Sequence, residues 1–172
     1  MNYKYCPICS NEFVFKKVRD DNRERLVCEK CGFVYYLNPA PATAVILIND
    51  NNEILLVKRK FEPHKGEWSL PAGFLEYEET VEECAIRELK EETNLDVELD
   101  GLYGVYSALE NPHKNILLVV YNGHKVGGEL HPGDDAMDAK YFSLDALPEK
   151  IAFGCHRHIL RQLNSKSYAE LK

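Results

Sequence analysis

Residues 73–95 read GFLEYEETVEECAIRELKEETNL, and most of the interpretation of this chain depends on how they fold. Thr80 followed three residues later by Glu83 has the pattern of a capping box, which predicts that a helix begins here. Apolar residues then recur at helical spacing, so one side of the helix is expected to face a core: Val81, Ala85 and Leu89.

Three glutamates occupy another side of the same helix. Glu88, Glu91 and Glu92 are three and four residues apart, so their like charges lie close together and repel. Such a group persists either because water solvates it or because a cation binds it. Hard divalent ions such as Mg²⁺ prefer carboxylate and carbonyl oxygens. For a helix taken alone the solvated interpretation is the default, and the segment before this helix favours the cation.

That segment is Leu-Pro-Ala-Gly, ending at Gly73, and it follows a short expected strand at residues 68–69. We expect Gly73 to allow a tight turn and to leave its carbonyl open to a ligand. Glu79 stands at the start of the helix. The guanidinium of Arg87 can hold a carboxylate one turn away in one orientation, either Glu83 or Glu91. Strand, glycine turn and acidic helix together predict a cation-binding site.

The spacing of these residues resembles the signature segment of Nudix hydrolases: Gly73, five residues, Glu79, seven residues, then Arg87-Glu88-Leu89-Lys90-Glu91-Glu92. The family usually has a glycine two residues after the last glutamate, where this chain has Asn94 before Leu95. Asparagine is the residue after glycine that best tolerates a left-handed helix end, so we expect the departure to affect only the local turn. The resemblance extends from about residue 39 to the C-terminal region.

The resemblance implies a fold and an activity. The fold is an α+β, Nudix-type α/β/α sandwich with a mixed sheet. The activity is hydrolysis of the diphosphate bridge of a nucleoside diphosphate linked to another group. The implied ligands of Mg²⁺ or Mn²⁺ are Glu88, Glu91, Glu92 and the Gly73 carbonyl, while Arg87 orients glutamates. Glu79 either binds metal through water or pairs with Arg87, and we favour a mixed role. Attack of water on a negatively charged phosphorus needs such charge neutralisation and an activated water.

The general base and the substrate contacts stay open between several residues. The base is either Glu88 or an acidic residue of a later loop, each of which is also readable as a solvated charge: Glu110, Asp134 or Asp135. Aromatic residues able to stack on a base, most of them also readable as packing residues, are Phe61, Trp68, Phe74, Tyr77 and Tyr106. For substrate binding we predict Phe74 and Glu110. Histidines in polar loops are surface residues or phosphate contacts, namely His64, His113 and His131, whereas His156 and His158 are predicted to be structural.

Four of the six cysteines form two CxxC pairs, at Cys6 and Cys9 and at Cys28 and Cys31. In a cytosolic chain this pattern predicts a tetrahedral zinc ribbon before it predicts disulfides. We therefore expect a zinc ribbon at residues 1–38 and a Nudix domain at residues 39–172. A segment as short as the ribbon buries little apolar surface, so structural Zn²⁺ would supply its folding energy. Cys84 is expected to be a small buried residue beside the apolar side of the helix.

The chain has 172 residues, a hydrophobic fraction of 45% and a net charge of −7. No apolar run is long enough to span a membrane and the N-terminus has no signal-like segment, so we expect a cytoplasmic protein. The negative charge disfavours nucleic acid as a partner of the whole chain. Residues 1–38 carry seven Lys and Arg against five Asp and Glu, which leaves a ribbon–nucleic acid contact as an alternative.

A zinc ribbon before a Nudix segment resembles the bacterial NADH pyrophosphatases. That group carries a Ser-Gln-Pro-Trp-Pro-Phe-Pro-like segment after the signature, where this chain reads LYGVYSA at residues 102–108. The residues 133–144 look more like the ADP-ribose pyrophosphatase branch. We therefore favour ADP-ribose or a related dinucleotide, with homodimers common in the family. The alternative is a nucleotide-sensing module whose ribbon contacts nucleic acid or protein.

The remaining pattern predicts mainly strands flanked by helices. Expected strands are residues 43–48, 54–58 paired to the first as a hairpin, 96–99, 103–107, 116–121 and an edge strand at 140–143. A turn is expected at Asn122 and Gly123, a loop at residues 127–135 and a short helical turn at 144–147. The last helix is expected to begin at His156 and to run to about residue 171.

Overall fold

The computed structural model describes residues 3–19, 22–109, 115–133 and 135–165. The chain folds as two compact units, Met1–Pro39 and Ala40–Lys172, which are described separately below. No helix in the described part of the chain is long and apolar enough to cross a membrane.

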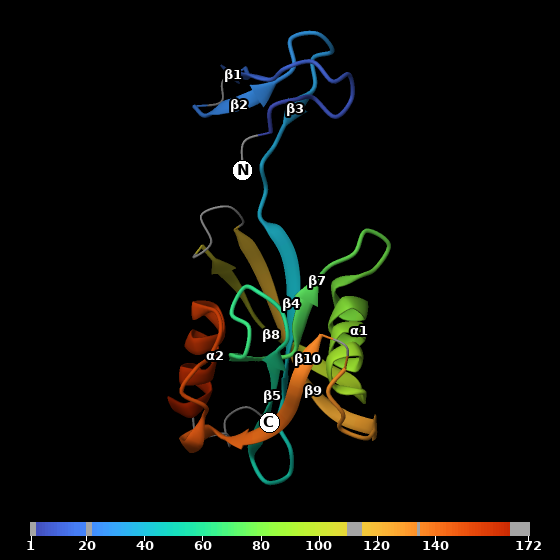
Figure 1. The fold of residues 1–172 in the computed structure, drawn as a ribbon, viewed down its shortest axis with the longest axis vertical. Helices are drawn as coiled ribbons and strands as arrows, with labels where there is room; N and C mark the ends of the chain where they lie inside the picture. The colour runs from blue at the N-terminus through green and yellow to red at the C-terminus, as the bar shows by residue number, and fades with distance from the viewer. Residues whose placement is uncertain (1–2, 20–21, 110–114, 134, 166–172) are drawn as a thin grey trace. The chain divides into compact units, whose positions relative to one another are not determined.

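The N-terminal unit is a small antiparallel sheet (Figure 1). Its strands are β1 (Val14–Lys17), β2 (Glu24–Val27) and β3 (Val34–Tyr35), in the order β1-β2-β3. Each CxxC turn closes with a backbone bond, from the Ser10 N–H to the Cys6 carbonyl at 2.9 Å and from the Gly32 N–H to the Cys28 carbonyl at 2.8 Å. Among the described residues of this unit only Cys6 and Cys28 are buried, so almost no apolar core holds it together.

The second unit contains two sheets. The first has the order β10-β5-β6 and the second the order β7-β4-β9-β8, with β4 and β9 parallel. The strands are β4 (Ala40–Leu47), β5 (Glu53–Arg59), β6 (Trp68–Ser69), β7 (Ala72–Phe74), β8 (Leu95–Ala108), β9 (Ile116–Gly128) and β10 (Ala136–Ser143). The sheets are therefore mixed, as expected.

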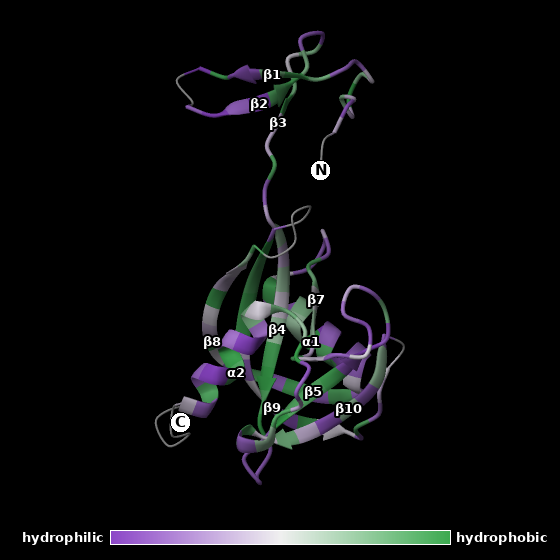
Figure 2. Ribbon diagram, turned by 60° about the vertical axis from the view of Figure 1, so that its left-hand side comes forward, coloured by the Kyte–Doolittle hydropathy of each residue, from purple (hydrophilic) through white to green (hydrophobic). Residues whose placement is uncertain are grey.

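Helices cover the sheets from opposite sides (Figure 1). These are α1 (Val81–Thr93) and α2 (Gly154–Ser165), with a short 3-10 helix, η1 (Leu144–Ala146), before α2. Alternate residues of β4 enter two different cores: Ala44 and Ile46 pack in the core that includes α2, while Val45 and Leu47 pack in the core that includes α1. Hydrophobic residues accordingly line β4, β5 and β9 between the helices (Figure 2). The expected α/β/α sandwich is confirmed.

Several expectations about strand pairing and strand ends are wrong. The predicted hairpin of residues 43–48 with 54–58 does not form, because both edges of β4 are taken by β7 and β9 and β5 pairs with β6 and β10. Only a single bridge joins Ile48 to Ile54. Likewise β8 and β9 each continue through residues expected to end or interrupt them. Gly101, at φ 149°, lies at a register shift between the two strands, and Gly123 pairs inside β9 opposite Leu99.

The C-terminal expectations hold in part. The strand expected at 140–143 is the end of β10, an edge strand, and the helical turn expected at 144–147 is η1. The last helix begins two residues earlier than expected, at Gly154, and the residues beyond Ser165 to which it was expected to run lie outside the described part.

Candidate active site

The acidic helix α1 begins and ends as the residue pattern predicts. The Thr80 hydroxyl accepts from the Glu83 N–H at 3.2 Å, and the Glu83 carboxylate accepts from the Thr80 N–H at 2.8 Å, which completes the capping box. At the other end Asn94 adopts φ 60°, the left-handed conformation expected of it. Because Glu83 is engaged in the cap, it is not a partner of Arg87.

Arg87 is the centre of a carboxylate network on this helix. Its Nε and Nη2 donate to the two oxygens of Glu79 at 2.9 and 2.7 Å, and its Nη1 donates to Glu88 at 2.8 Å and to Glu91 at 3.1 Å. The forked contact with Arg87 lowers the pKa of Glu79 to about 2. Glu79 is therefore an ionised partner of Arg87, and the guanidinium fixes the orientation of the Glu88 side chain.

The structure gives a reason for glycine at position 73 that differs from the expected tight turn. It lies inside β7, paired with Thr43 of β4. A Cβ added to Gly73 would lie 1.8 Å from the carboxylate carbon of Glu88. A larger residue would displace that carboxylate from its place beside the strand, so Gly73 shapes the acidic site by close approach rather than by turning the chain.

Glu92 is a buried carboxylate beside the same strand. One of its oxygens accepts from the Ala72 N–H at 2.9 Å. Burial raises the pKa of Glu92 to about 8, and the nearby charges of Glu88 and Asp135 act in the same direction. Burial likewise raises the pKa of Glu88. Oxygen donors that are hard to ionise alone fit divalent cations, which favour the charged form of each carboxylate.

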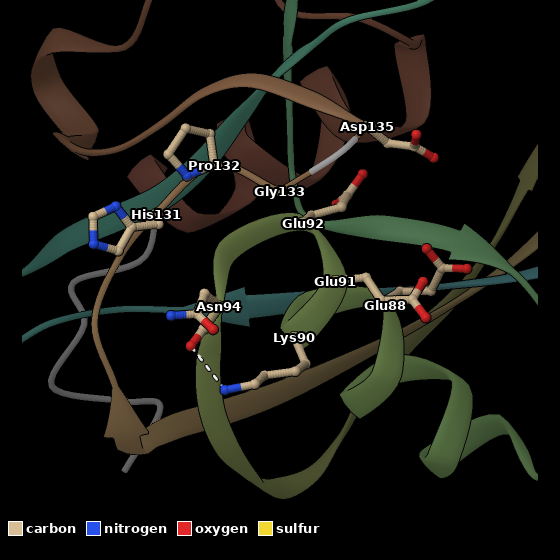
Figure 3. Close-up of a pocket in the computed structure, with 9 residues that line it drawn as sticks. All are labelled: Glu88, Lys90, Glu91, Glu92, Asn94, His131, Pro132, Gly133 and Asp135. Atoms are coloured by element: carbon tan, nitrogen blue, oxygen red, sulfur yellow. Dashed lines mark hydrogen bonds between the residues drawn. The ribbon is translucent and has the colours of Figure 1, made fainter.

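A cavity of about 480 Å³ opens beside the acidic helix (Figure 3). The carboxylates of Glu88, Glu91, Glu92 and Asp135 gather at one end of the view and the side chains of His131 and Asn94 lie at the other. The loop before β10 is bonded to the end of α1, since the Gly133 N–H donates to the Glu92 carbonyl and the His131 N–H to the Thr93 carbonyl, both at 3.0 Å. A Cβ on Gly133 would lie 1.6 Å from the Glu91 carbonyl oxygen, so a glycine is required for this contact.

A second cavity, of about 530 Å³, is lined in part by β7 and is more apolar. Ala72 and Gly73, the residues that contact Glu92 and Glu88, form part of its wall. Its remaining walls come from the ends of β4, β5, β8 and β9 and from the start of α2, with Arg59, His64, Phe74, Phe153 and His156 as the polar and aromatic members. Strand β7 therefore contacts the carboxylates of α1 and also forms part of the wall of this cavity.

The structure places some of the other predicted residues at these cavities and separates others from them. Phe74 is half-exposed and lines the second cavity, and Asp135 lines the first. Trp68 packs edge-on against Phe142 with a centroid distance of 4.7 Å, and the Tyr106 hydroxyl donates to Gln162, so both are packing residues. Phe61 and Tyr77 are exposed and line neither cavity. Glu110, His113 and Asp134 lie outside the described residues. Cys84 is buried, as expected.

His156 is structural, as predicted, and its surroundings give it a pH dependence. The Leu70 N–H donates to its Nδ1 at 3.1 Å, which anchors the segment before β7 to α2. Burial lowers the pKa of His156 to about 3, and the charges of Arg59 and Arg157 add to this effect. The ring is therefore neutral in the folded protein and protonates in the unfolded chain near pH 6.5.

We expect acid to destabilise the protein through His156. The unfolded chain binds the additional proton between pH 6.5 and 3, so the free energy of unfolding falls as the pH drops through this window, by up to about 1.4 kcal/mol per pH unit. Chemical unfolding of wild type and His156→Gln at several pH values between 5 and 7 measures this effect. The variant should have the flatter profile, and the control His158→Gln, an exposed histidine on the same helix, should follow wild type. Parallel profiles for wild type and His156→Gln would contradict the assignment.

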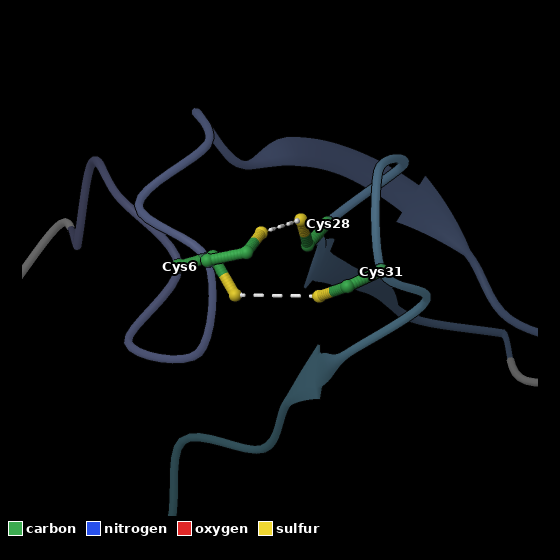
Figure 4. A group of neighbouring side chains, drawn as sticks. Cys6, Cys28 and Cys31 are labelled. Carbon is green, nitrogen blue, oxygen red and sulfur yellow. Dashed lines mark hydrogen bonds between the residues drawn. The ribbon is translucent and has the colours of Figure 1, made fainter.

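The four cysteines of the N-terminal unit form a compact cluster (Figure 4). All four Sγ atoms lie within 4.8 Å of one another, with Cys6 to Cys31 at 3.7 Å and Cys9 to Cys28 at 3.4 Å. A zinc ion with four thiolates at about 2.3 Å requires sulfur–sulfur distances of about 3.8 Å. The cluster therefore fits a tetrahedral zinc ion, and the unit is a zinc ribbon.

Two residues at the cavities of the second unit were not predicted from the sequence. Arg59, at the end of β5, lines the second cavity, and Gly133 holds the loop that carries Asp135. Gly133 stands in a run of turn residues, so its close approach to α1 has no local signal. Arg59 is the last residue of the largely apolar strand β5, and only the packing of that strand shows where its side chain lies.

Comparisons with known proteins agree with this geometry. Residues 38–163 match the family model described as NUDIX domain, and residues 4–37 match the model described as Nudix N-terminal. An ADP-ribose pyrophosphatase of Methanocaldococcus jannaschii is 46% identical over 127 residues, covering 73% of each chain. The NAD-capped RNA hydrolase NudC of Pseudomonas aeruginosa is 34% identical over 93% of this chain, which spans only 54% of that protein.

Solved structures extend the comparison. A NUDIX hydrolase from Nitrosomonas europaea superposes with a TM-score of 0.83 at 32% identity, covering 95% of this chain and 92% of that one. A bifunctional NMN adenylyltransferase/ADP-ribose pyrophosphatase from Francisella tularensis, in complex with AMP and a manganese ion, superposes with a TM-score of 0.61 at 27% identity, covering 74% of this chain and 42% of that one.

Proposed function

Because the chain belongs to the Nudix hydrolase family, we propose that it hydrolyses the diphosphate bridge of a nucleoside diphosphate derivative, with ADP-ribose as the favoured substrate and Mg²⁺ or Mn²⁺ as cofactor. The observation that carries the proposal is the carboxylate cluster of Glu88, Glu91 and Glu92 beside Gly73. Two of these side chains have raised pKa values because they are buried. Glu88, Glu91, Glu92 and the Gly73 carbonyl are the proposed metal ligands.

Divalent ions held there would neutralise the diphosphate and acidify the attacking water. The protein contributes the orientation of the donors. Arg87 holds Glu88 through Nη1, and the Ala72 N–H holds Glu92, so neither carboxylate has to reorganise when the substrate arrives. Glu79 acts through Arg87 and keeps that guanidinium in place. Among the described residues, Glu88 and Asp135 are the candidates for the proton acceptor.

Two relatives support the choice of substrates to be compared. The M. jannaschii relative, whose name is ADP-ribose pyrophosphatase, aligns at the higher identity. The P. aeruginosa relative, whose name is NAD-capped RNA hydrolase, aligns over nearly the whole chain, which favours NAD-capped RNA as a second candidate. The AMP and manganese of the F. tularensis structure are consistent with a metal-dependent site for an adenine nucleotide.

The test is a substrate panel in ¹⁸O-labelled water. We expect divalent-dependent conversion of ADP-ribose to AMP and ribose 5-phosphate, faster than hydrolysis of NADH, NAD-capped RNA or nucleoside triphosphates. Mass spectrometry of the products locates the label and identifies the phosphorus that water attacks. If ADP-ribose is untouched while NAD-capped RNA is cleaved, the substrate preference is wrong; if no diphosphate is hydrolysed, the enzymatic proposal is wrong.

A further inference from the structure

Arg59 lies at the end of β5 and lines the more apolar cavity together with Gly73 and Phe74. Its side chain is partly buried, and burial is the main influence on its pKa, which it lowers. The Nε atom donates to the Pro63 carbonyl at 2.9 Å, which anchors the guanidinium at the cavity wall.

Arg59 differs from Arg87 in its contacts with carboxylates. Within the described residues, no Asp or Glu oxygen forms an ion pair with its guanidinium, whereas Arg87 pairs with Glu79, Glu88 and Glu91. Four carboxylates act on Arg59 without a direct ion pair, namely those of Glu92, Asp135, Glu62 and Glu67. A partly buried guanidinium that has no direct carboxylate partner keeps its hydrogen-bond donors available for an anionic ligand. The cavity is the space in which such an anion can bind.

The aromatic ring of Phe153 packs against the Arg59 guanidinium. The Arg59 guanidinium carbon lies 4.9 Å from the centroid of the Phe153 ring, a cation–π contact. Phe153 has φ 57°, a left-handed conformation that is unusual for a bulky residue. The preceding residues are fixed to β6, because the Trp68 N–H donates to the Lys150 carbonyl at 2.9 Å and the Ala152 N–H to the Trp68 carbonyl at 2.7 Å. The chain therefore maintains a strained conformation at the residue that supports Arg59.

We propose that Arg59 is a substrate-binding residue whose two terminal amino groups hold the phosphate of the nucleotide half of the substrate. The planar fork of arginine matches two phosphate oxygens, and Nε is already engaged by Pro63, which leaves Nη1 and Nη2 for the ligand. Bound metal ions and Arg59 would then both contribute to neutralising the diphosphate. This inference rests on the proposed function for the identity of the ligand.

The probe is a pair of ligands that differ only by the phosphate, AMP and adenosine. With Mg²⁺ present, calorimetry should give tighter binding of AMP than of adenosine to wild type. In Arg59→Gln this preference should fall by about 10- to 100-fold, the range expected for loss of hydrogen bonds to a charged group. Arg59→Lys keeps the charge without the fork and should fall between the two. Adenosine affinity should be the same in all proteins.

The control is Arg161→Gln, which removes a charge from the exposed side of α2 and should leave the preference unchanged. Thermal unfolding verifies that each variant is folded, and Arg59→Lys decides the question if Arg59→Gln is not. An unchanged AMP preference in the folded Arg59 variants, or no AMP preference in wild type, overturns the proposal. If the preference depends on Arg59 but wild type hydrolyses no diphosphate, the phosphate site stands and only the proposed reaction fails.

Discussion

Glu92→Gln is expected to lower kcat/KM for ADP-ribose by about 10³-fold or more, because several kcal/mol of charge stabilisation are lost and each 1.36 kcal/mol is a factor of ten. The substituted amide keeps an oxygen that can accept from the Ala72 N–H, so the fold and the position of β7 should be preserved. The measurement is steady-state hydrolysis as a function of Mg²⁺ concentration, with thermal unfolding to verify folding.

The matched control for that experiment is Glu78→Gln. Glu78 is exposed in the segment before α1 and lines neither cavity, so the same change of charge and size there should have no effect on rate. Equal rates for wild type and Glu92→Gln would show that chemistry does not occur at this helix. A variant that regains activity only at high Mg²⁺ would instead locate the defect in metal affinity.

Cys28→Ser is expected to unfold the N-terminal unit. Only Cys6 and Cys28 are buried among its described residues, so its folding free energy must come mostly from a bound metal, and structural zinc supplies about 10–16 kcal/mol in comparable small units. Elemental analysis of wild type should find about one zinc ion per chain. In the variant the zinc should be lost, and limited proteolysis should cleave within residues 1–39 while residues 40–165 stay protected.

Cys155→Ser serves as the control for this second experiment. Cys155 lies in the other unit and outside the cysteine cluster, so this variant should keep its zinc. If Cys28→Ser keeps the wild-type proteolysis pattern and wild type contains no zinc, the metal assignment of the ribbon is wrong.

The features predicted correctly from sequence are those encoded by neighbouring residues. The capping box of Thr80 and Glu83, the left-handed Asn94 and the apolar side of α1 each depend on spacings of a few residues, which a helix enforces locally. The cysteine pairs are likewise recognisable because each CxxC turn is a local structure. These patterns were sufficient for the family, the architecture and the carboxylate cluster.

The features missed or predicted wrongly depend on pairing between distant residues. The hairpin of β4 with β5 is absent because β9 and β7 occupy the edges of β4, and no local pattern specifies which distant strand wins. The reason for Gly73 is the carboxylate of Glu88, fifteen residues later on a different element. The position of Arg59 at a cavity is similarly evident only from the fold, because β5, β7 and the start of α2 together line that cavity.

The parallel pairing of β4 with β9 has a consequence for how the chain folds during synthesis. Residues Ala40 to Leu47 find their partners at Ile116 to Gly123, so the middle of the sheet cannot assemble until most of the polypeptide has left the ribosome. Until β9 is synthesised, the apolar strand β4 has no pairing partner on the edge that β9 will occupy. Such non-local pairing slows folding and prolongs the exposure of apolar segments. Nascent chains arrested before β9 should therefore be prone to aggregate.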